Sequence, residues 1–182
     1  MQPIQHFKTI TQHRQLVRYY CFRIGLYRQG LMHDLSKYSP VEFVRGAIYY
    51  QGNRSPNNKE REVKGVSMSW LHHKGRNKHH FEYWIDYTLD ENGKVGFGGN
   101  RMPKKYVAEM FCDRVAASRI YRGDAYTDAD PYDYYIKGKQ FGSTGRMIHP
   151  ETAAELEEML RLLKFEGEDA AIEHIRKWLK EK

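Results

Sequence analysis

The chain has 182 residues, 40% of them hydrophobic and 29% charged, and a formal net charge of +7. This length suits one domain, and the composition excludes a disordered chain. No apolar run approaches the ~18 residues that cross a bilayer. Cys21 and Cys112 lie far apart, so we expect reduced thiols in a cytoplasmic protein without membrane contact. The positive charge favours an anionic partner without identifying it.

Apolar spacing in the first third of the chain predicts three helices. Residues from Ile4 to Gly25 place apolar side chains at helical intervals, and the glycine ends the helix. A second helix is expected over about 26–35. A third begins at Ser39-Pro40-Val41-Glu42, where serine caps the helix, proline takes its first position and glutamate closes a capping box.

The rest of the chain continues the helical pattern with one interruption. A helix is expected over about 59–74. A small hairpin or irregular loop is expected over 88–101, because Asn92-Gly93 is a turn signal. Gly96-Phe97-Gly98-Gly99 lacks a nucleotide-binding pattern and is interpreted as a flexible loop. The remaining expected elements are a helix over 103–121, a short helix over 130–138 and an antiparallel helix pair over 150–165 and 168–180. The predicted fold class is all-α.

Histidine is concentrated in one part of the sequence, which indicates metal or proton chemistry. Four of the nine histidines lie within one nine-residue stretch. A metal site on helices needs ligands from several elements, since one helix rarely supplies more than two. The candidate ligands are His13 or His6, His33, Asp34, His73, His79, His80 and Asp113. Imidazole and carboxylate ligands together suit Mn, Fe, Zn, Ni or Co.

Other polar residues near these candidates have a structural and a functional interpretation. Lys37 follows Asp34 by three residues, so a continued helical turn places its ammonium on the same face, where it can hold a phosphate. Asn77 either bonds its own backbone or points its amide at substrate. Glu42 either closes its capping box or contacts the metal. Glu109 is expected to orient a histidine.

The segment His33-Asp34-Leu35-Ser36-Lys37 resembles the signature of the HD-domain metal-dependent phosphohydrolase superfamily, in which HD is followed after two residues by lysine. His13 matches that family's first histidine in kind, and Asp113 in EMFCDRVAA resembles its final aspartate. More narrowly, residues 6–121 are similar to an uncharacterised family of small HD-like proteins. The shared motifs HDLSK, SPxEF, WxxH and NxHHxEYW contain, beyond HDLSK, Glu42, Trp70, His73, Asn77, His79, His80, Glu82, Tyr83 and Trp84.

The resemblance implies a helical metalloprotein with one or two divalent ions, Mg included among the candidates. The implied organisation is one HD-like helical domain over 1–182, with a metal-site core over 6–121 and a helical extension over 122–182. The broader family does not decide between His79 and His80. His13 fits the narrower pattern better than His6 and is preferred, although its spacing to the HD pair is somewhat short.

Together these features predict a metal-dependent phosphohydrolase that acts on a nucleotide or another small phosphorylated anion through metal-activated water. The residues expected to act in catalysis are Asp34, Lys37, Glu42 and Asn77. The residues expected to bind substrate are Lys37, Arg76 and Lys78, the last two because their basic run lies between candidate ligands. The oligomeric state is open, and a homodimer is compatible with the sequence.

Two other functions stay open at the level of sequence. Some HD-type scaffolds with an H…HD…H…H…D ligand set hold two irons and activate dioxygen, so a di-iron oxygenase is the first alternative. The second is a non-catalytic regulatory module that binds a nucleotide or nucleic acid on its basic surface. It ranks lower because unused buried histidines and aspartates would only reduce stability.

Overall fold

The computed structural model describes residues 1–89, 92–141 and 147–181. Within these ranges the chain is mainly helical with one two-stranded sheet, which confirms the expected fold class. The helices are α1 (Pro3–Arg23), α2 (Tyr27–Met32), α3 (Pro40–Ile48), α4 (Pro56–Lys64), α5 (Met68–Lys74), α6 (Lys104–Arg122), α7 (Asp130–Phe141), α9 (Pro150–Glu166) and α10 (Glu168–Trp178). Short 3-10 helices cover Leu35–Tyr38, Phe81–Trp84 and Gly123–Ala125, and the strands are β1 (Ile85–Leu89) and β2 (Val95–Gly99).

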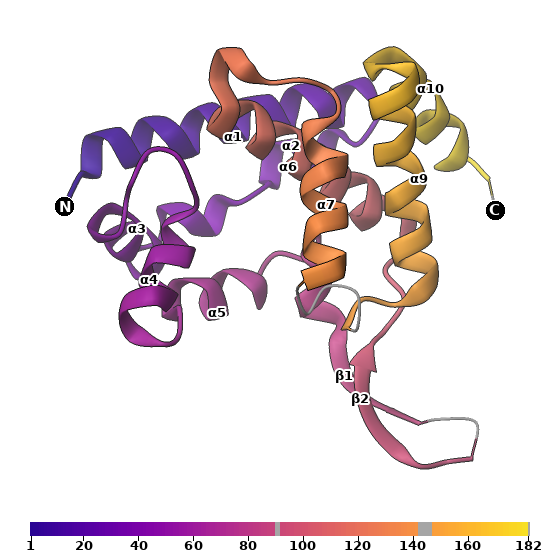
Figure 1. The fold of residues 1–182 in the computed structure, drawn as a ribbon, viewed down its shortest axis with the longest axis horizontal. Helices are drawn as coiled ribbons and strands as arrows, with labels where there is room; N and C mark the ends of the chain where they lie inside the picture. Colours follow the sequence, from indigo (N-terminus) through magenta and orange to yellow (C-terminus); the bar gives the residue numbers. More distant parts are fainter. Residues whose placement is uncertain (90–91, 142–146, 182) are drawn as a thin grey trace.

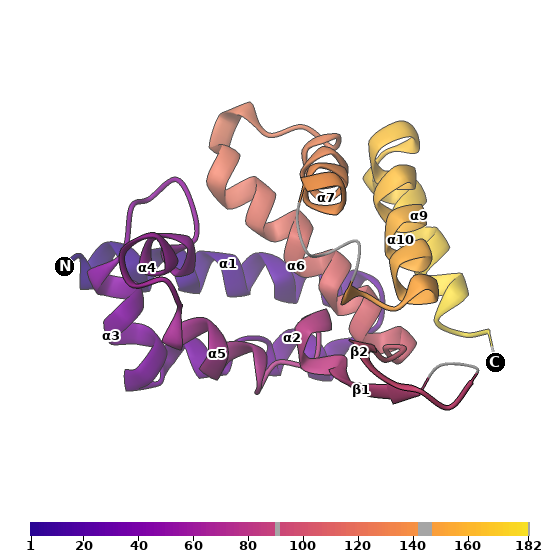
Figure 2. The same cartoon turned by 60° about the horizontal axis from the view of Figure 1, so that its bottom comes forward.

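The long helices share one hydrophobic core. α6 packs against α1 and α9, and α9 packs against α7 and α10. Figure 1 shows α3, α4 and α5 at one end of the molecule and α9 and α10 at the other, with the two strands projecting away. Figure 2 shows α6 running diagonally between α1 and α7. The buried core includes Val17, Tyr20, Cys21, Val107, Phe111, Cys112, Leu156, Leu160, Leu163 and Ile175.

Several sequence expectations are confirmed by these elements. The expected bounds of α1, α6, α9 and α10 agree closely with the structure, and Gly25 follows α1 with φ 84°. Cys21 and Cys112 are buried free thiols, as expected. None of the described helices combines the length and apolarity needed to cross a bilayer.

The second helix is shorter than expected, and the difference reshapes the motif that follows it. α2 ends at Met32, His33 is extended with ψ 127°, and Asp34 has left-handed backbone angles, φ 51° and ψ 27°. Among the described residues, Asp34 is the only non-glycine with positive φ. Such a conformation costs roughly 1–2 kcal/mol and is more accessible to aspartate than to most residues. Lys37 therefore lies in a 3-10 turn and not on a continuation of α2.

Two other local expectations are wrong. The single helix expected over 59–74 is two helices, α4 and α5, because Gly65 ends the first with φ 75°. The capping box is not formed either, since the Ser39 side chain makes no capping hydrogen bond with the described part of α3. The carboxylate of Glu42 bonds to histidines of α5 instead.

β1 and β2 form the expected hairpin as an antiparallel pair. Gly93, in the turn signal, has φ 76°, whereas residues 90–91 lie outside the described part of the chain. The glycine-rich segment interpreted as a flexible loop is strand β2. A Cβ atom at Gly99 would collide with the backbone carbonyl of Met147, so this close approach of two backbones requires glycine.

Candidate metal centre

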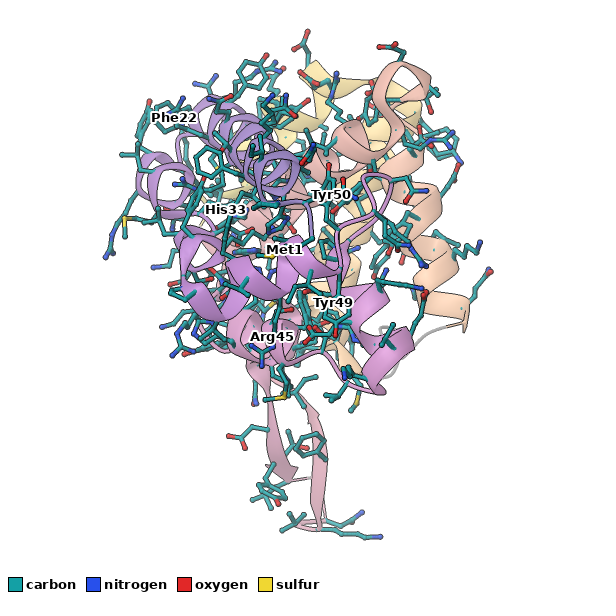
Figure 3. The ribbon with its side chains drawn as sticks, turned by 90° about the vertical axis from the view of Figure 1, so that its left-hand side faces the viewer. Met1, Phe22, His33, Arg45, Tyr49 and Tyr50 are labelled. Carbon is teal, nitrogen blue, oxygen red and sulfur yellow. The ribbon has the colours of Figure 1, made fainter. Side chains whose placement is uncertain are left out.

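Candidate ligands that are distant in sequence converge between α1, α5 and α6. They are His13 on α1, His33 and Asp34 after α2, His73 on α5, His79 and His80 after α5, and Asp113 on α6. Figure 3 shows the labelled His33 inside this end of the molecule, whereas Phe22 lies at its outer edge. Adjacent residues of a continuous helix diverge by about 100°. The break after Met32 removes that constraint, so His33 and Asp34 face the same centre.

The first group of ligand atoms belongs to His13, His33, Asp34 and Asp113. Asp34 Oδ2 lies 3.3 Å from His33 Nε2 and 3.8 Å from His13 Nε2. Asp113 Oδ1 lies 2.9 Å from His13 Nε2 and 3.5 Å from His33 Nε2. Two imidazole nitrogens and two carboxylate oxygens therefore face one another, and this donor set suits a divalent transition metal.

The second group belongs to Asp34, His73, His79 and His80. Asp34 Oδ1 lies 3.3 Å from His73 Nε2 and 3.4 Å from His79 Nε2. His80 Nε2 lies 2.9 Å from His73 Nε2. Both members of the His79-His80 pair thus reach this group, and Asp34 presents one oxygen to each group.

Buried atoms without hydrogen bonds test whether these residues fit a metal. Within the described residues, five buried atoms of the two groups have no hydrogen-bond partner of acceptable geometry: His13 Nε2, His33 Nε2, His79 Nε2, Asp34 Oδ1 and Asp34 Oδ2. An unsatisfied buried polar atom costs about 1–3 kcal/mol, more when it is charged. Divalent cations at the two positions would satisfy all five atoms, so the donor set fits.

The opposite edges of the histidine rings are held by carboxylates. Glu109 Oε1 lies 2.9 Å from His33 Nδ1 and 3.2 Å from His79 Nδ1. Glu42 Oε2 lies 2.7 Å from His73 Nδ1. A carboxylate that accepts from Nδ1–H fixes the tautomer that leaves the Nε2 lone pair free for a metal. The expectation that Glu109 orients a histidine agrees with this geometry, and two histidines are involved.

The charges in the first group stabilise one another despite burial. Burial disfavours ionised Asp34, but His33 and Lys37 outweigh it and hold the pKa of its carboxyl well below the usual value. Burial also disfavours charged His33, but Asp34 raises the pKa of this imidazole well above the usual value. Burial opposes ionisation of Asp113, but the nearby imidazoles of His13 and His33 outweigh it and hold the pKa of this carboxyl well below its usual value. A cation at this group would therefore meet ionised carboxylates and would have to displace the His33 proton.

Lys37 and Asn77 lie at the edge of the centre in different roles. Lys37 Nζ is 2.6 Å from Asp34 Oδ2, and its side chain is 28% exposed. Asn77 donates through Nδ2 to Ser36 Oγ at 2.8 Å and to the backbone carbonyl of His73 at 2.8 Å. These bonds match the structural interpretation of Asn77. Ser36 was not among the candidates from the sequence. Its place inside the HDLSK segment is the feature that could have indicated a role at the centre.

Four other candidates lie outside the two groups. Glu42 bonds His72 and His73 at Nδ1, so it positions histidines and does not face the ligand atoms. His6 packs against the rings of Phe43 and Tyr50. The described contacts of Arg76 and Lys78 are peripheral: Arg76 Nη1 reaches the His72 carbonyl at 3.4 Å, and Lys78 Nζ lies 5.5 Å from the Tyr83 ring centroid. Both cations are exposed.

A family model described as a family of unknown function, DUF5662, matches residues 2–162. No curated protein and no solved structure matches the chain.

Proposed function

Because the chain belongs to DUF5662, a family of unknown function, we propose its activity from the centre itself: a metal-dependent hydrolase of small phosphorylated anions. The observation that carries the proposal is that, among the described residues, five buried ligand atoms without a hydrogen bond of acceptable geometry face one another, and the Lys37 ammonium is paired with one of them, Asp34 Oδ2. The resemblance of HDLSK to the HD-domain phosphohydrolase signature supports phosphate esters as the substrate class.

The two groups would hold the cations. His13, His33 and Asp113 would bind one ion, the histidines of the second group another, and Asp34 would contribute to both positions. Mixed nitrogen and oxygen donors suit Mn, Fe, Zn, Ni or Co better than Mg, which prefers oxygen. A bound divalent ion supplies Lewis-acid chemistry, since it lowers the pKa of water and offsets charge on phosphoryl oxygens.

Lys37 gives the centre its preference for an anion. Its side chain and that of Asp113 are partly exposed, whereas His33 and Asp34 are fully buried, so a substrate approaches from the lysine side. Burial disfavours the charged ammonium, but the carboxylate of Asp34 outweighs burial and raises the pKa of Lys37. Lys37 therefore stays charged at neutral pH and can donate to a phosphoryl oxygen as negative charge grows there.

Asp113 and Asp34 contribute differently to the proposed reaction. Fully buried Asp34 presents one oxygen to each ligand group, and its Oδ2 also contacts the Lys37 ammonium. Partly exposed Asp113 accepts a contact from His13 on the side from which substrate would approach. The two carboxylates thus supply negative charge for cations, and Lys37 supplies the positive charge that a phosphate needs. The combination favours a phosphoester over a neutral substrate.

The proposal is tested by phosphate release from a panel of nucleotides and simple phosphoesters, with protein loaded with Mn²⁺. We expect release by the unmodified protein, loss of release in Asp34→Asn, and unchanged release in Asp124→Asn, a matched change at an exposed aspartate. Asparagine tolerates the left-handed backbone at position 34, so this variant keeps the local fold.

Absence of phosphate release from every panel member by metal-loaded protein would overturn the proposal.

The histidine-rich donor set also suits iron. Oxygen consumption by Fe²⁺-loaded protein, without phosphate release under Mn²⁺, would assign the centre to oxygenase chemistry instead.

A further inference from the structure

One carboxylate oxygen contacts a histidine from each ligand group. Glu109 Oε1 lies 2.9 Å from Nδ1 of His33, a member of the first group, and 3.2 Å from Nδ1 of His79, a member of the second. All three side chains are at most 7% exposed. On the opposite edges of the same rings, Asp34 lies 3.3 Å from His33 Nε2 and 3.4 Å from His79 Nε2.

We propose that Glu109 is a positioning residue that links the two cation positions, so that each position depends on it and the filling of one favours the other. The inference rests on the metal centre of the proposed function, though not on the reaction assigned to it. It distinguishes Glu109 from Glu42, which contacts a ligand histidine of the second group alone, His73, together with the neighbouring His72.

The physical basis is the effect of a metal on the hydrogen bond at the far side of an imidazole. A cation at His33 Nε2 makes the Nδ1–H a stronger donor, which fixes Glu109 Oε1 in place. The same oxygen then holds His79 in the tautomer and orientation that present Nε2 to the second position. Binding of the first ion thus orders side chains that the second ion also needs, so the second ion binds at a lower entropy cost. The difference is a coupling free energy between the two sites.

Glu109 is placed for this role by the backbone of α6. It lies one helical turn before Asp113, so the helix that supplies a first-group ligand also supplies the link. Electrostatic repulsion between two cations disfavours binding of the second ion. This repulsion is present with and without Glu109, so comparing unmodified protein with a Glu109 variant isolates the contribution of Glu109.

The test measures Mn²⁺ affinity at each position separately. His80→Ala removes a ligand of the second group and reports on the first position, and His13→Ala removes a ligand of the first group and reports on the second. Glu109→Gln or Glu42→Gln is then added to each background. Free Mn²⁺ is quantified by electron paramagnetic resonance, and circular dichroism of the metal-free variants checks the fold.

We expect Glu109→Gln to weaken Mn²⁺ binding about 10- to 100-fold in both backgrounds, the usual effect of removing a ligand's hydrogen-bond partner. Glu42→Gln should weaken binding in the His13→Ala background and leave the His80→Ala background unchanged. In otherwise unmodified protein, Glu109→Gln should lower the ratio of second to first stepwise affinity.

An effect of Glu109→Gln in one background only, or equal effects of the two variants in both, overturns the linkage. Linked Mn²⁺ binding without phosphate release would reject the hydrolase and retain the linkage. Phosphate release by protein whose two positions bind Mn²⁺ independently would retain the hydrolase and reject the linkage. Unmodified protein that binds no Mn²⁺ contradicts both proposals.

Discussion

The two ends of the molecule use burial in opposite ways. The helix pair α9 and α10 buries apolar side chains, among them Leu160, Leu163 and Ile175. The candidate metal centre buries charged and polar groups, among them Asp34 and His33, which are fully buried. Apolar burial stabilises a fold by about 25 cal/mol per Å², whereas buried charge opposes folding unless it is paired. Burial at α9 and α10 therefore favours folding directly, whereas burial at the candidate centre requires that its charges be paired.

The stable region is attached to the helices that carry the centre. Glu168, at the start of α10, accepts hydrogen bonds from Tyr20 and Arg119, each at 2.8 Å, and from Arg23. Tyr20 lies on α1 with His13, and Arg119 lies on α6 with Asp113. The C-terminal pair thus fixes the two helices between which the first group of ligands assembles.

The largest effect is expected on the rate of hydrolysis, from a substitution in the candidate metal centre. Asp34→Asn removes the carboxylate that faces both ligand groups, so hydrolysis of any accepted phosphoester should fall by about 1,000-fold or more, roughly 4 kcal/mol in the barrier. Steady-state rates measure the loss. A variant that retains more than a tenth of the rate would show that Asp34 does not hold the catalytic ions.

A substitution in the hydrophobic core at α9 is expected to lower stability without affecting Mn²⁺ binding. Leu160→Ala leaves a cavity in the fully buried core and should lower the free energy of unfolding by about 2–5 kcal/mol. The matched change Leu89→Ala, at a residue that is 71% exposed, should stay within about 0.5 kcal/mol. Urea denaturation of metal-free protein measures both. A loss of Mn²⁺ binding by still-folded Leu160→Ala protein would argue against separate regions.

Lys37→Met is expected to separate anion binding from metal binding. It removes the cation beside Asp34, so kcat/KM for a phosphoester should fall about 10- to 100-fold, roughly 1.4–2.7 kcal/mol, while Mn²⁺ binding persists. Parallel kinetics and metal titration measure the two properties. An unchanged kcat/KM would remove Lys37 from the substrate site.

His6, which lies outside the two ligand groups, should make the free energy of unfolding depend on pH. Burial, followed by the charge of Lys37, lowers the pKa of His6 to about 4, against a reference of about 6.5 for an unfolded chain. Between these values the unfolded state binds more protons, so stability falls as pH falls through this window, by about 2 kcal/mol at pH 5. His6→Asn should lack this contribution in urea titrations at pH 7 and 5. An identical pH dependence in both proteins would contradict the assignment.

The smallest effects are expected at the exposed cations predicted from sequence to bind substrate. Arg76→Ala and Lys78→Ala should each change kcat/KM by less than about threefold, because solvent and salt screen charges at the surface. Measurements at low and moderate ionic strength provide the control. A loss comparable with that of Lys37→Met would support the sequence prediction that these residues bind substrate.

The sequence anticipates much of the fold because the long helices carry their own signals. Gly25 after α1 marks a boundary that the structure confirms. The break after α2 has no comparable signal. It requires left-handed Asp34, whose carboxylate contacts His13, His73 and His79 across the fold. Local propensity alone cannot show contacts of this kind.

The candidate site was predictable in composition but not in arrangement. Residue types and motif spacing identified the histidines and aspartates that converge. Their pairing depends on distances across the fold, so the sequence left open whether His6 or His13 belonged to the first group and whether His79 or His80 reached the second. The role of Glu42 was missed for the same reason, because its capping box is a local pattern and its contact with His73 joins α3 to α5.

Asp34 is proposed to lie between cation positions supplied by residues 13 to 113. Anomalous X-ray diffraction from crystals of Mn²⁺-loaded protein would locate these positions. We expect anomalous peaks at about 2.0–2.6 Å from the Asp34 carboxylate oxygens, one beside His13 and Asp113 and one beside His73 and His79. Occupied Mn²⁺ sites elsewhere in the molecule, with no peak beside Asp34, would contradict it.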